Sequence, residues 1–156
     1  MQIRRATEKD ADAVAHVLNE AFAEFKRLYT RAGYDATTPD VANIKARLAE
    51  GPTWLAEDGA AIVGTVSAIA RDDGVYVRSM AVMPAARGKR VALHLMRQLE
   101  LFAVSKKAER LYLSTTPFLF SAIRLYESLG FRRTGEPPDD LFGTPLVTMA
   151  KPLRRA

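Results

Sequence analysis

Apolar positions in the first third of the chain recur every three or four residues, which is the spacing of one helical face. This pattern covers residues 7–28 and follows a short segment, residues 2–5, that can form a strand. Gly33 interrupts the pattern, so we expect the helix to stop before it. A second helix is predicted over residues 38–51, because a threonine cap and a proline start it and Gly-Pro ends it.

The rest of the chain alternates strand and helix patterns. Strands are predicted over residues 53–56, 61–70, 75–82, 111–115, 131–135 and 145–151, and helices over residues 88–107 and from about 118 to a C-cap at Gly130. A loop, residues 137–140, separates the last two strands.

The resulting order is β-α-α-β-β-β-α-β-α-β-β. It predicts an α/β fold with one mixed central sheet of about seven strands and four helices, in a single domain over residues 1–156. The unit from residue 75 to 115 should be a right-handed parallel crossover within an otherwise largely antiparallel sheet.

Composition narrows the classes of function. The chain has no cysteine, which excludes disulfides, thiolate zinc sites and a cysteine nucleophile, and it fits a reducing cytosol. No export signal or membrane-spanning stretch is visible, so we expect a cytoplasmic protein. The formal charge of +5 suggests an anionic partner: nucleic acid, an acidic surface or a phosphorylated small molecule.

The segment with the most informative chemistry joins the strand ending at Val82 to the following helix. A helix start presents backbone amides without partners and a partial positive charge, and Arg87, Lys89 and Arg90 add three cations there. Such a start can bind phosphate, but it can also be a solvated basic turn. Neither of the two common glycine-rich nucleotide loops is present.

Two motifs resemble the GNAT family of N-acetyltransferases. Residues 87–92 read RGKRVA, similar to that family's acetyl-CoA loop R/Q-x-x-G-x-G/A, and residues 122–131 read AIRLYESLGF, similar to its A-I-x-L-Y-x-x-x-G-F. The separation of the motifs and the order of elements match over almost the whole chain. The resemblance implies the GNAT fold and an acetyl-CoA-dependent transfer of an acetyl group to a primary amine, by direct attack in a ternary complex.

The resemblance also implies roles for individual residues. Met80, Ala81 and Val82 would offer backbone groups to the pantetheine arm, with the Met80 amide as the oxyanion donor. The segment Arg87, Gly88, Lys89, Arg90, Val91 and Ala92 would hold the pyrophosphate of acetyl-CoA, and Tyr126 would be the general acid that protonates the departing thiolate. Taken outside its motif, Tyr126 is simply an aromatic residue on a buried helical stripe.

Two positions depart from the family pattern. Arg90 stands where the family has its middle glycine, and we expect it in an unstrained first helical turn, contacting phosphate. Leu119 stands where the family often has an asparagine that contacts the cofactor, so that contact is absent or is made by backbone.

No general base is evident. Strand 75–82 carries no carboxylate, so deprotonation of the amine is expected to rely on water, carbonyl groups or desolvation, which favours an amine of low pKa. The remaining candidates are interpreted as turn, loop or helix-surface residues: Asp72, Asp73, Asp139, Asp140, His16 and His94. Asp139 and Asp140, in the last predicted hairpin, could also attract a cationic amine. The histidines are too few and too far apart for a metal site.

Acceptor specificity is expected from the segment between the first two helices and from the last hairpin. Candidate acceptor residues are Tyr29, Arg78, Ser114 and Thr115. The sequence does not say which amine is used, or whether the chain forms a homodimer. Two other classes stay open: a non-catalytic CoA-binding domain, and nucleic-acid binding, which the scarcity of aromatic residues outside core positions disfavours.

Overall fold

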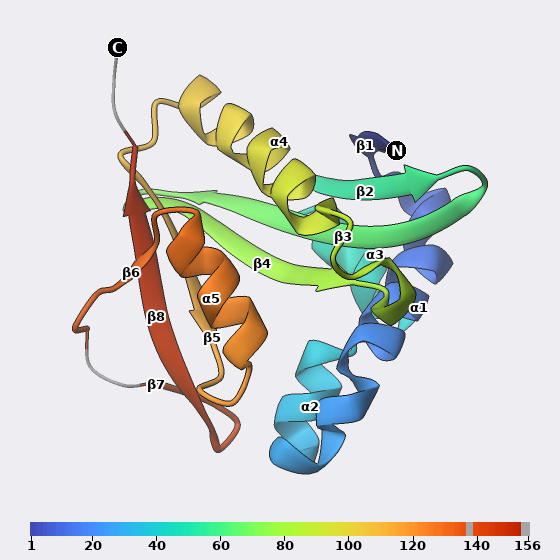
Figure 1. The fold of residues 1–156 in the computed structure, drawn as a ribbon, viewed down its shortest axis with the longest axis horizontal. Helices are drawn as coiled ribbons and strands as arrows, with labels where there is room; N and C mark the ends of the chain where they lie inside the picture. The colour runs from blue at the N-terminus through green and yellow to red at the C-terminus, as the bar shows by residue number, and fades with distance from the viewer. Residues whose placement is uncertain (137–138, 154–156) are drawn as a thin grey trace.

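A single mixed sheet organises the chain. The structure, a computed structural model, describes residues 1–136 and 139–153. The described strands are β1 Gln2–Arg5, β2 Thr53–Asp58, β3 Ala61–Arg71, β4 Gly74–Val82, β5 Arg110–Thr115, β6 Arg132–Arg133, β7 Asp139–Leu141 and β8 Thr144–Pro152. They follow the order β1-β2-β3-β4-β5-β8-β6, with β7 paired to β8 (Figure 1).

Five α-helices and three short 3₁₀ turns lie along the described chain. They are η1 Glu8–Asp10, α1 Ala11–Phe22, η2 Ala23–Leu28, α2 Arg31–Thr37, α3 Val41–Leu48, η3 Pro84–Ala86, α4 Val91–Ser105 and α5 Phe120–Ser128. The sequence predicted four helices and about seven strands, so the fold class is confirmed and the structure adds one helix and the short strand β7.

Helices cover both faces of the sheet, and each face has its own apolar cluster. Leu95 of α4 and Ile123 of α5 pack with Ala56 on one face, whereas Leu18 of α1 and Ile44 of α3 pack with Leu55 on the other. Neighbouring strand residues point to opposite faces, which explains how adjacent positions of β2 serve separate clusters. In Figure 1, α5 lies in front of the strands and α3 passes behind them.

Strands β4 and β5 form the one parallel pair among the described strands, as predicted for the crossover unit, and α4 connects them. Their pairing covers only Val75 with Leu111 and Tyr76 with Tyr112. Beyond these two pairs the strands diverge, which Figure 1 shows as a widening angle between β4 and β5. The divergence leaves a gap in the middle of the sheet.

A β-bulge in β4 lies where this divergence begins. Ser67 pairs with Arg78 and Thr65 with Ala81, so two residues of β4, Ser79 and Met80, lie opposite one residue of β3. Ser79 has a φ of 58°, in the left-handed region. A bulge bends its strand and shifts the alternation of side chains. Met80 accordingly packs on the α4 face, the face to which Val77 also points, although Val77 and Met80 are three residues apart.

The first helical region differs from its prediction. Helix α1 ends at Phe22 and continues as η2, and Gly33 lies inside helix α2 instead of stopping a helix. A Cβ at Gly33 would lie 2.5 Å from Thr144 Oγ1 and 2.8 Å from the Leu141 carbonyl oxygen. This glycine is therefore needed for the close approach of α2 to the β7–β8 hairpin, not for a chain break.

The second predicted helix start is displaced by two residues. Asp40, not Thr38, caps α3, and its carboxylate accepts a hydrogen bond of 2.9 Å from the Asn43 backbone. In the last hairpin, Asp139 and Asp140 belong to strand β7 and not to a loop, because they pair with β8. Residues 137 and 138, predicted as part of the same loop, lie outside the described residues.

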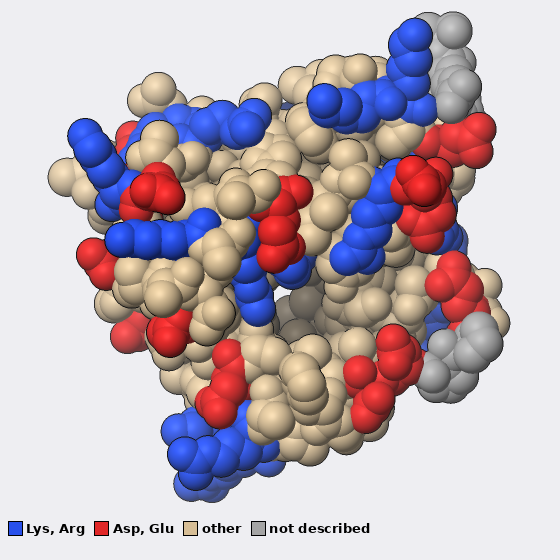
Figure 2. Space-filling view, turned by 180° about the vertical axis from the view of Figure 1, so that it is seen from behind, with Lys and Arg blue, Asp and Glu red and all other residues tan. Residues whose placement is uncertain are grey.

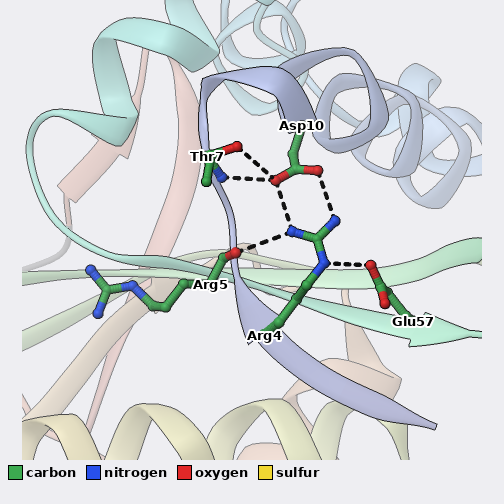
Figure 3. A network of polar contacts seen from close by, with 5 residues as sticks. All are labelled: Arg4, Arg5, Thr7, Asp10 and Glu57. Carbon is green, nitrogen blue, oxygen red and sulfur yellow. Dashed lines mark hydrogen bonds and ion pairs between the residues drawn. The ribbon is translucent and has the colours of Figure 1, made fainter.

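A polar network ties the N-terminus to the sheet (Figure 3). Arg4 donates two hydrogen bonds to the Asp10 carboxylate, at 2.8 and 2.9 Å, and also pairs with Glu57 of β2. Asp10 in turn accepts a hydrogen bond of 2.8 Å from the Thr7 backbone. The Arg4 guanidinium holds the pKa of Asp10 at about 2, below its ordinary value. The network fixes strand β1 to the start of α1.

Candidate active site

A cleft of about 1410 Å³ occupies the gap between β4 and β5. Its walls come from both diverging strands, from the start of α4, from α5, and from the η2–α2 segment together with the β7–β8 hairpin. Figure 2, which views the molecule from behind, shows the hollow near the centre of the face, with basic side chains close to its rim. The cleft therefore passes through the sheet at the point where its hydrogen bonding is interrupted.

The turn that enters α4 has two residues in the left-handed region. Gly88 has a φ of 81°, and Arg90 caps the helix with φ 62° and ψ 22°. The prediction that Arg90 lies in an unstrained helical turn is therefore wrong, and α4 begins at Val91 instead of residue 88. Left-handed backbone costs an L-residue roughly 1–2 kcal/mol, so Arg90 is strained at a position that suits glycine.

The strained turn places backbone amides where they can bind an anion. The first amides of α4, from Val91 onward, have no partner within the helix, and Val91 and Ala92 line the cleft together with Gly88 and Arg90. Backbone N–H groups gathered in a turn next to a helix start form a concave site for phosphate.

The three cations expected at this turn do not lie together. Arg87 pairs with Glu24 and donates a hydrogen bond of 3.1 Å to the Ala21 carbonyl, so its guanidinium links the turn to α1 and η2. Arg90 is exposed and lines the cleft, whereas Lys89 is exposed and lies outside the cleft lining. Of the three, Arg90 is best placed for an anion at the start of α4.

Strand residues Met80, Ala81 and Val82 all line the cleft. Met80 is the second residue of the bulge, and Ala81 and Val82 follow it on the part of β4 that has separated from β5. Their β5-facing edge therefore borders the gap instead of a neighbouring strand, which leaves this stretch of backbone available to a ligand.

Tyr126 lies on α5, between the core and the cleft. Its side chain is buried, its ring centroid lies 5.8 Å from that of Phe131, and it also lines the cleft. Tyr126 can therefore be both a core aromatic residue and a residue of the cleft, because one side of its ring packs in the core. Burial raises the pKa of Tyr126 well above the usual range of tyrosine, so the hydroxyl stays protonated at neutral pH. Leu119, at the N-cap of α5, lines the cleft without a side-chain cap.

The four candidate acceptor residues, Tyr29, Arg78, Ser114 and Thr115, all line the same cleft. Tyr29 is buried with its ring centroid 4.9 Å from Phe118, and burial raises its pKa. Two further arginines that the sequence did not single out, Arg47 and Arg71, also line the cleft. Arg47 belongs to the short helix α3 and is half-buried. The sequence pattern does not distinguish it from an ordinary basic residue on a helix surface.

The carboxylates considered as general bases are placed differently from one another. Asp139 and Asp140 line the cleft and accept backbone hydrogen bonds of 2.8 and 2.7 Å within their own hairpin. Asp73 accepts a hydrogen bond of 2.8 Å from the Tyr112 hydroxyl. The cleft lining does not include Asp72, His16 or His94, and strand β4 contributes no carboxylate to it.

The described part of the chain contains no group of three or more His, Asp or Glu residues arranged to hold a metal ion. None of the helices within residues 1–136 and 139–153 is both long and apolar enough to cross a membrane.

Comparison with known proteins identifies the class. Residues 14–131 match the model of the acetyltransferase (GNAT) family, and the chain belongs to that family. This membership confirms the fold and the enzyme class, N-acetyltransferase, that the two sequence motifs implied.

The relatives and solved structures agree with this class. An uncharacterized N-acetyltransferase of Escherichia coli, YjgM, is 32% identical over 139 residues, covering 83% of this chain and 80% of that protein. N-acetylaspartate synthetase of Danio rerio is 40% identical over 106 residues, which cover 64% of this chain but only 37% of that protein. The structure of Salmonella typhimurium yncA, a putative acetyltransferase with acetyl-CoA, is 27% identical with a TM-score of 0.76, and the match covers 100% of this chain and 95% of that one.

Proposed function

We propose that the protein transfers an acetyl group from acetyl-CoA to a primary amine, by direct attack of the amine in a ternary complex. The observation that carries the proposal is the cleft through the sheet between β4 and β5. It allows a donor bound beside α4 and α5 to meet an acceptor that enters beside α2 and α3. The similarity to yncA, whose structure contains acetyl-CoA, supports this donor.

The start of α4 fits the phosphates of the donor. The amides of the segment from Gly88 to Ala92 would hold the pyrophosphate, with Arg90 as the nearest cation and Arg87 and Lys89 adding positive potential. The backbone of Met80, Ala81 and Val82, which borders the gap, would bind the pantetheine arm. Acetyl-CoA supplies the acetyl group as an activated thioester.

Two groups of the chain would act on the reacting atoms. The Met80 amide donates a hydrogen bond to the oxygen that becomes negative when the amine attacks, a contact of the kind that contributes a few kcal/mol in acyl transfer. A nitrogen–carbon bond forms, the carbon–sulfur bond breaks, and the Tyr126 hydroxyl donates its proton to the departing sulfur. The proton that the amine loses leaves through water. Since the chain has no cysteine, a thiol of the protein does not carry the acetyl group.

Thiol release from acetyl-CoA tests this function. The screen covers N-terminal peptides, lysine peptides, polyamines, aminoglycosides and free amino acids. With a productive amine, Tyr126→Phe should reduce the rate by about 100-fold or more, the scale of a lost general acid. Arg124→Gln is the control, because Arg124 is an exposed residue of the same helix outside the cleft lining, and it should keep the wild-type rate.

The alternatives give different results in the same assay. Binding of CoA without thiol release for any amine would indicate a non-catalytic CoA-binding domain. Full activity of Tyr126→Phe would refute the role of the tyrosine. Salt-dependent binding of RNA or DNA at micromolar concentration would revive nucleic-acid binding, although basic and acidic side chains are interspersed on the face in Figure 2.

We also propose that residues 1–156 act as one N-acetyltransferase domain in the cytoplasm, which the absence of cysteine supports. Limited proteolysis and cell fractionation test these two points. Whether the domain forms a homodimer is tested by sedimentation.

A further inference from the structure

Two arginines from different elements come together on the acceptor side of the cleft. Arg47 extends from α3 and Arg78 from β4, and both line the cleft. Arg47 Nη1 lies 3.5 Å from the Ser79 hydroxyl, directly beside Arg78 in the chain. Burial and the positive charge of Arg78 both lower the pKa of Arg47, which reflects how close the two guanidinium groups are.

The protein supplies too little negative charge for this pair. Arg78 Nη2 lies 2.9 Å from Glu50 Oε2, but the Glu50 side chain is 46% exposed and is the one carboxylate paired with either arginine among the described residues. Arg47 instead donates a hydrogen bond of 2.9 Å to the Ala36 carbonyl. Two cations therefore share one partly solvated anion.

Two hydrogen-bond donors of Arg78 also lack full partners among the described residues. Its buried Nε atom has no hydrogen-bond partner there, and its buried Nη2 atom has only the ion pair with Glu50. Buried charged donors without acceptors are unfavourable, so proteins seldom keep them without a purpose. Arg71 adds a third positive charge to the same cleft, where its guanidinium lies 4.5 Å from the Tyr76 ring centroid.

We infer that the acceptor is a small amine carrying a carboxylate, such as a free amino acid, and that Arg47 and Arg78 bind this carboxylate. The inference rests on the proposed function and names its acceptor class. Guanidinium groups match the shape of a carboxylate, and a paired site can hold both of its oxygens. Bound this way, the carboxylate supplies the missing negative charge and the missing acceptors together.

The position of Arg78 along β4 suits a small acceptor molecule. Arg78 precedes Met80 by two residues, and the bulge makes the rise between them shorter than the roughly 6–7 Å of two residues in a regular strand. Since Met80 marks the proposed site of attack, a carboxylate at Arg78 would leave an amine a few atoms away close to the thioester. The bulge between the two residues directs the Arg78 side chain to the acceptor face and the Met80 side chain to the α4 face.

The experiment compares each amino acid with its own α-amide as acceptor, using thiol release from acetyl-CoA. Glycine, leucine and aspartate provide three side-chain sizes. An amide has the less basic amine and so more neutral nucleophile near pH 7, which would favour it if the carboxylate did not matter. We expect kcat/KM to be about 10- to 100-fold higher for at least one free acid than for its amide, the scale of a charge-assisted contact.

Variants separate recognition from folding. Arg78→Gln and Arg47→Gln should each raise KM for the free acid by about 10-fold or more, while KM for acetyl-CoA stays the same and kcat/KM for the amide falls much less than kcat/KM for the acid. Glu50→Gln should lower KM for the acid, because it removes the competing carboxylate, an effect in the opposite direction to simple damage. Arg124→Gln, an exposed arginine of α5 outside the cleft lining, is the control and should match the wild type.

The outcomes distinguish failure of the acceptor inference from failure of the proposed acetyltransferase function. Equal use of acids and amides, or an acid KM that Arg78→Gln and Arg47→Gln leave unchanged, overturns the inference and leaves the proposed function standing. A preference for peptides without a free carboxylate also overturns the inference and leaves the proposed function standing. The absence of thiol release with every amine overturns the proposed function and, with it, this inference.

Discussion

Replacing Arg90 with glycine should stabilise the fold and weaken donor binding at the same time. Arg90 holds φ at 62° and ψ at 22°, and its exposed side chain makes no ion pair with the described residues. Glycine removes a left-handed penalty of roughly 1–2 kcal/mol but adds chain entropy to the unfolded state, at a cost of about 0.5–1 kcal/mol. The net gain in the free energy of unfolding should be about 0.5–1 kcal/mol.

Urea denaturation and thermal melting measure this gain. For a domain of this size, 1 kcal/mol corresponds to a rise in Tm of roughly 2–4 °C. Arg90→Ala is the control, because it removes the same side chain but keeps the strained backbone, and its Tm should stay close to that of the wild type. A Tm for the glycine variant no higher than that of the alanine variant would refute the argument from backbone strain.

The same pair of variants tests the phosphate contact. Both should bind CoA about 2- to 5-fold more weakly than the wild type at low salt, because an exposed ion pair contributes at most about 1 kcal/mol, and the difference should shrink as salt rises. Unchanged or tighter binding by Arg90→Gly would show that the arginine makes no contact with the donor.

Three further predictions concern other parts of the molecule. Asp10 has a folded pKa of about 2, below its unfolded value, so its pairing with Arg4 stabilises the fold above about pH 4 and is lost as pH falls toward 2. Asp10→Asn should cost about 1–2 kcal/mol at pH 7 and flatten the acid part of the stability curve, as urea titrations at several pH values would show. Gly33→Ala should lower stability by about 1–3 kcal/mol by forcing α2 away from Thr144, measured by thermal melting, and a neutral effect would contradict the close approach. Because burial raises the pKa of Tyr126, ionisation of this tyrosine should not limit the pH–rate profile below about pH 10, and an alkaline limb that Tyr126→Phe abolishes at lower pH would contradict this.

The central elements could be predicted from the sequence because their patterns are local. Alternating and helical apolar spacing located β4, α4, β5 and α5 to within a few residues. The motif residues Gly88 and Tyr126, and Met80, which the family resemblance singled out, all line one cleft. The backbone of Arg90 could not be predicted in the same way. An arginine favours the right-handed region by itself, and only the geometry of the whole strand-to-helix turn requires the left-handed one.

Features that depend on distant segments were missed or misinterpreted. Gly33 suggested a helix end, whereas it permits contact with a hairpin more than a hundred residues later. Asp139 and Asp140 suggested a loop because their strand is defined by pairing with β8. Arg47 could not be singled out from the sequence, because its proposed role depends on its closeness to Arg78, which lies on another element.

The short pairing between β4 and β5 has a thermodynamic consequence. Two register pairs join the two halves of the sheet, so few backbone hydrogen bonds connect them. A donor that lies in the gap between β4 and β5 and hydrogen-bonds to β4 would act as an additional strand and couple the two halves. Saturation at 100 times Kd adds about 2.7 kcal/mol to the free energy of unfolding, and amide exchange should slow first along β4 and β5. A donor bound in this way would make the stability of the whole sheet depend on the supply of acetyl-CoA.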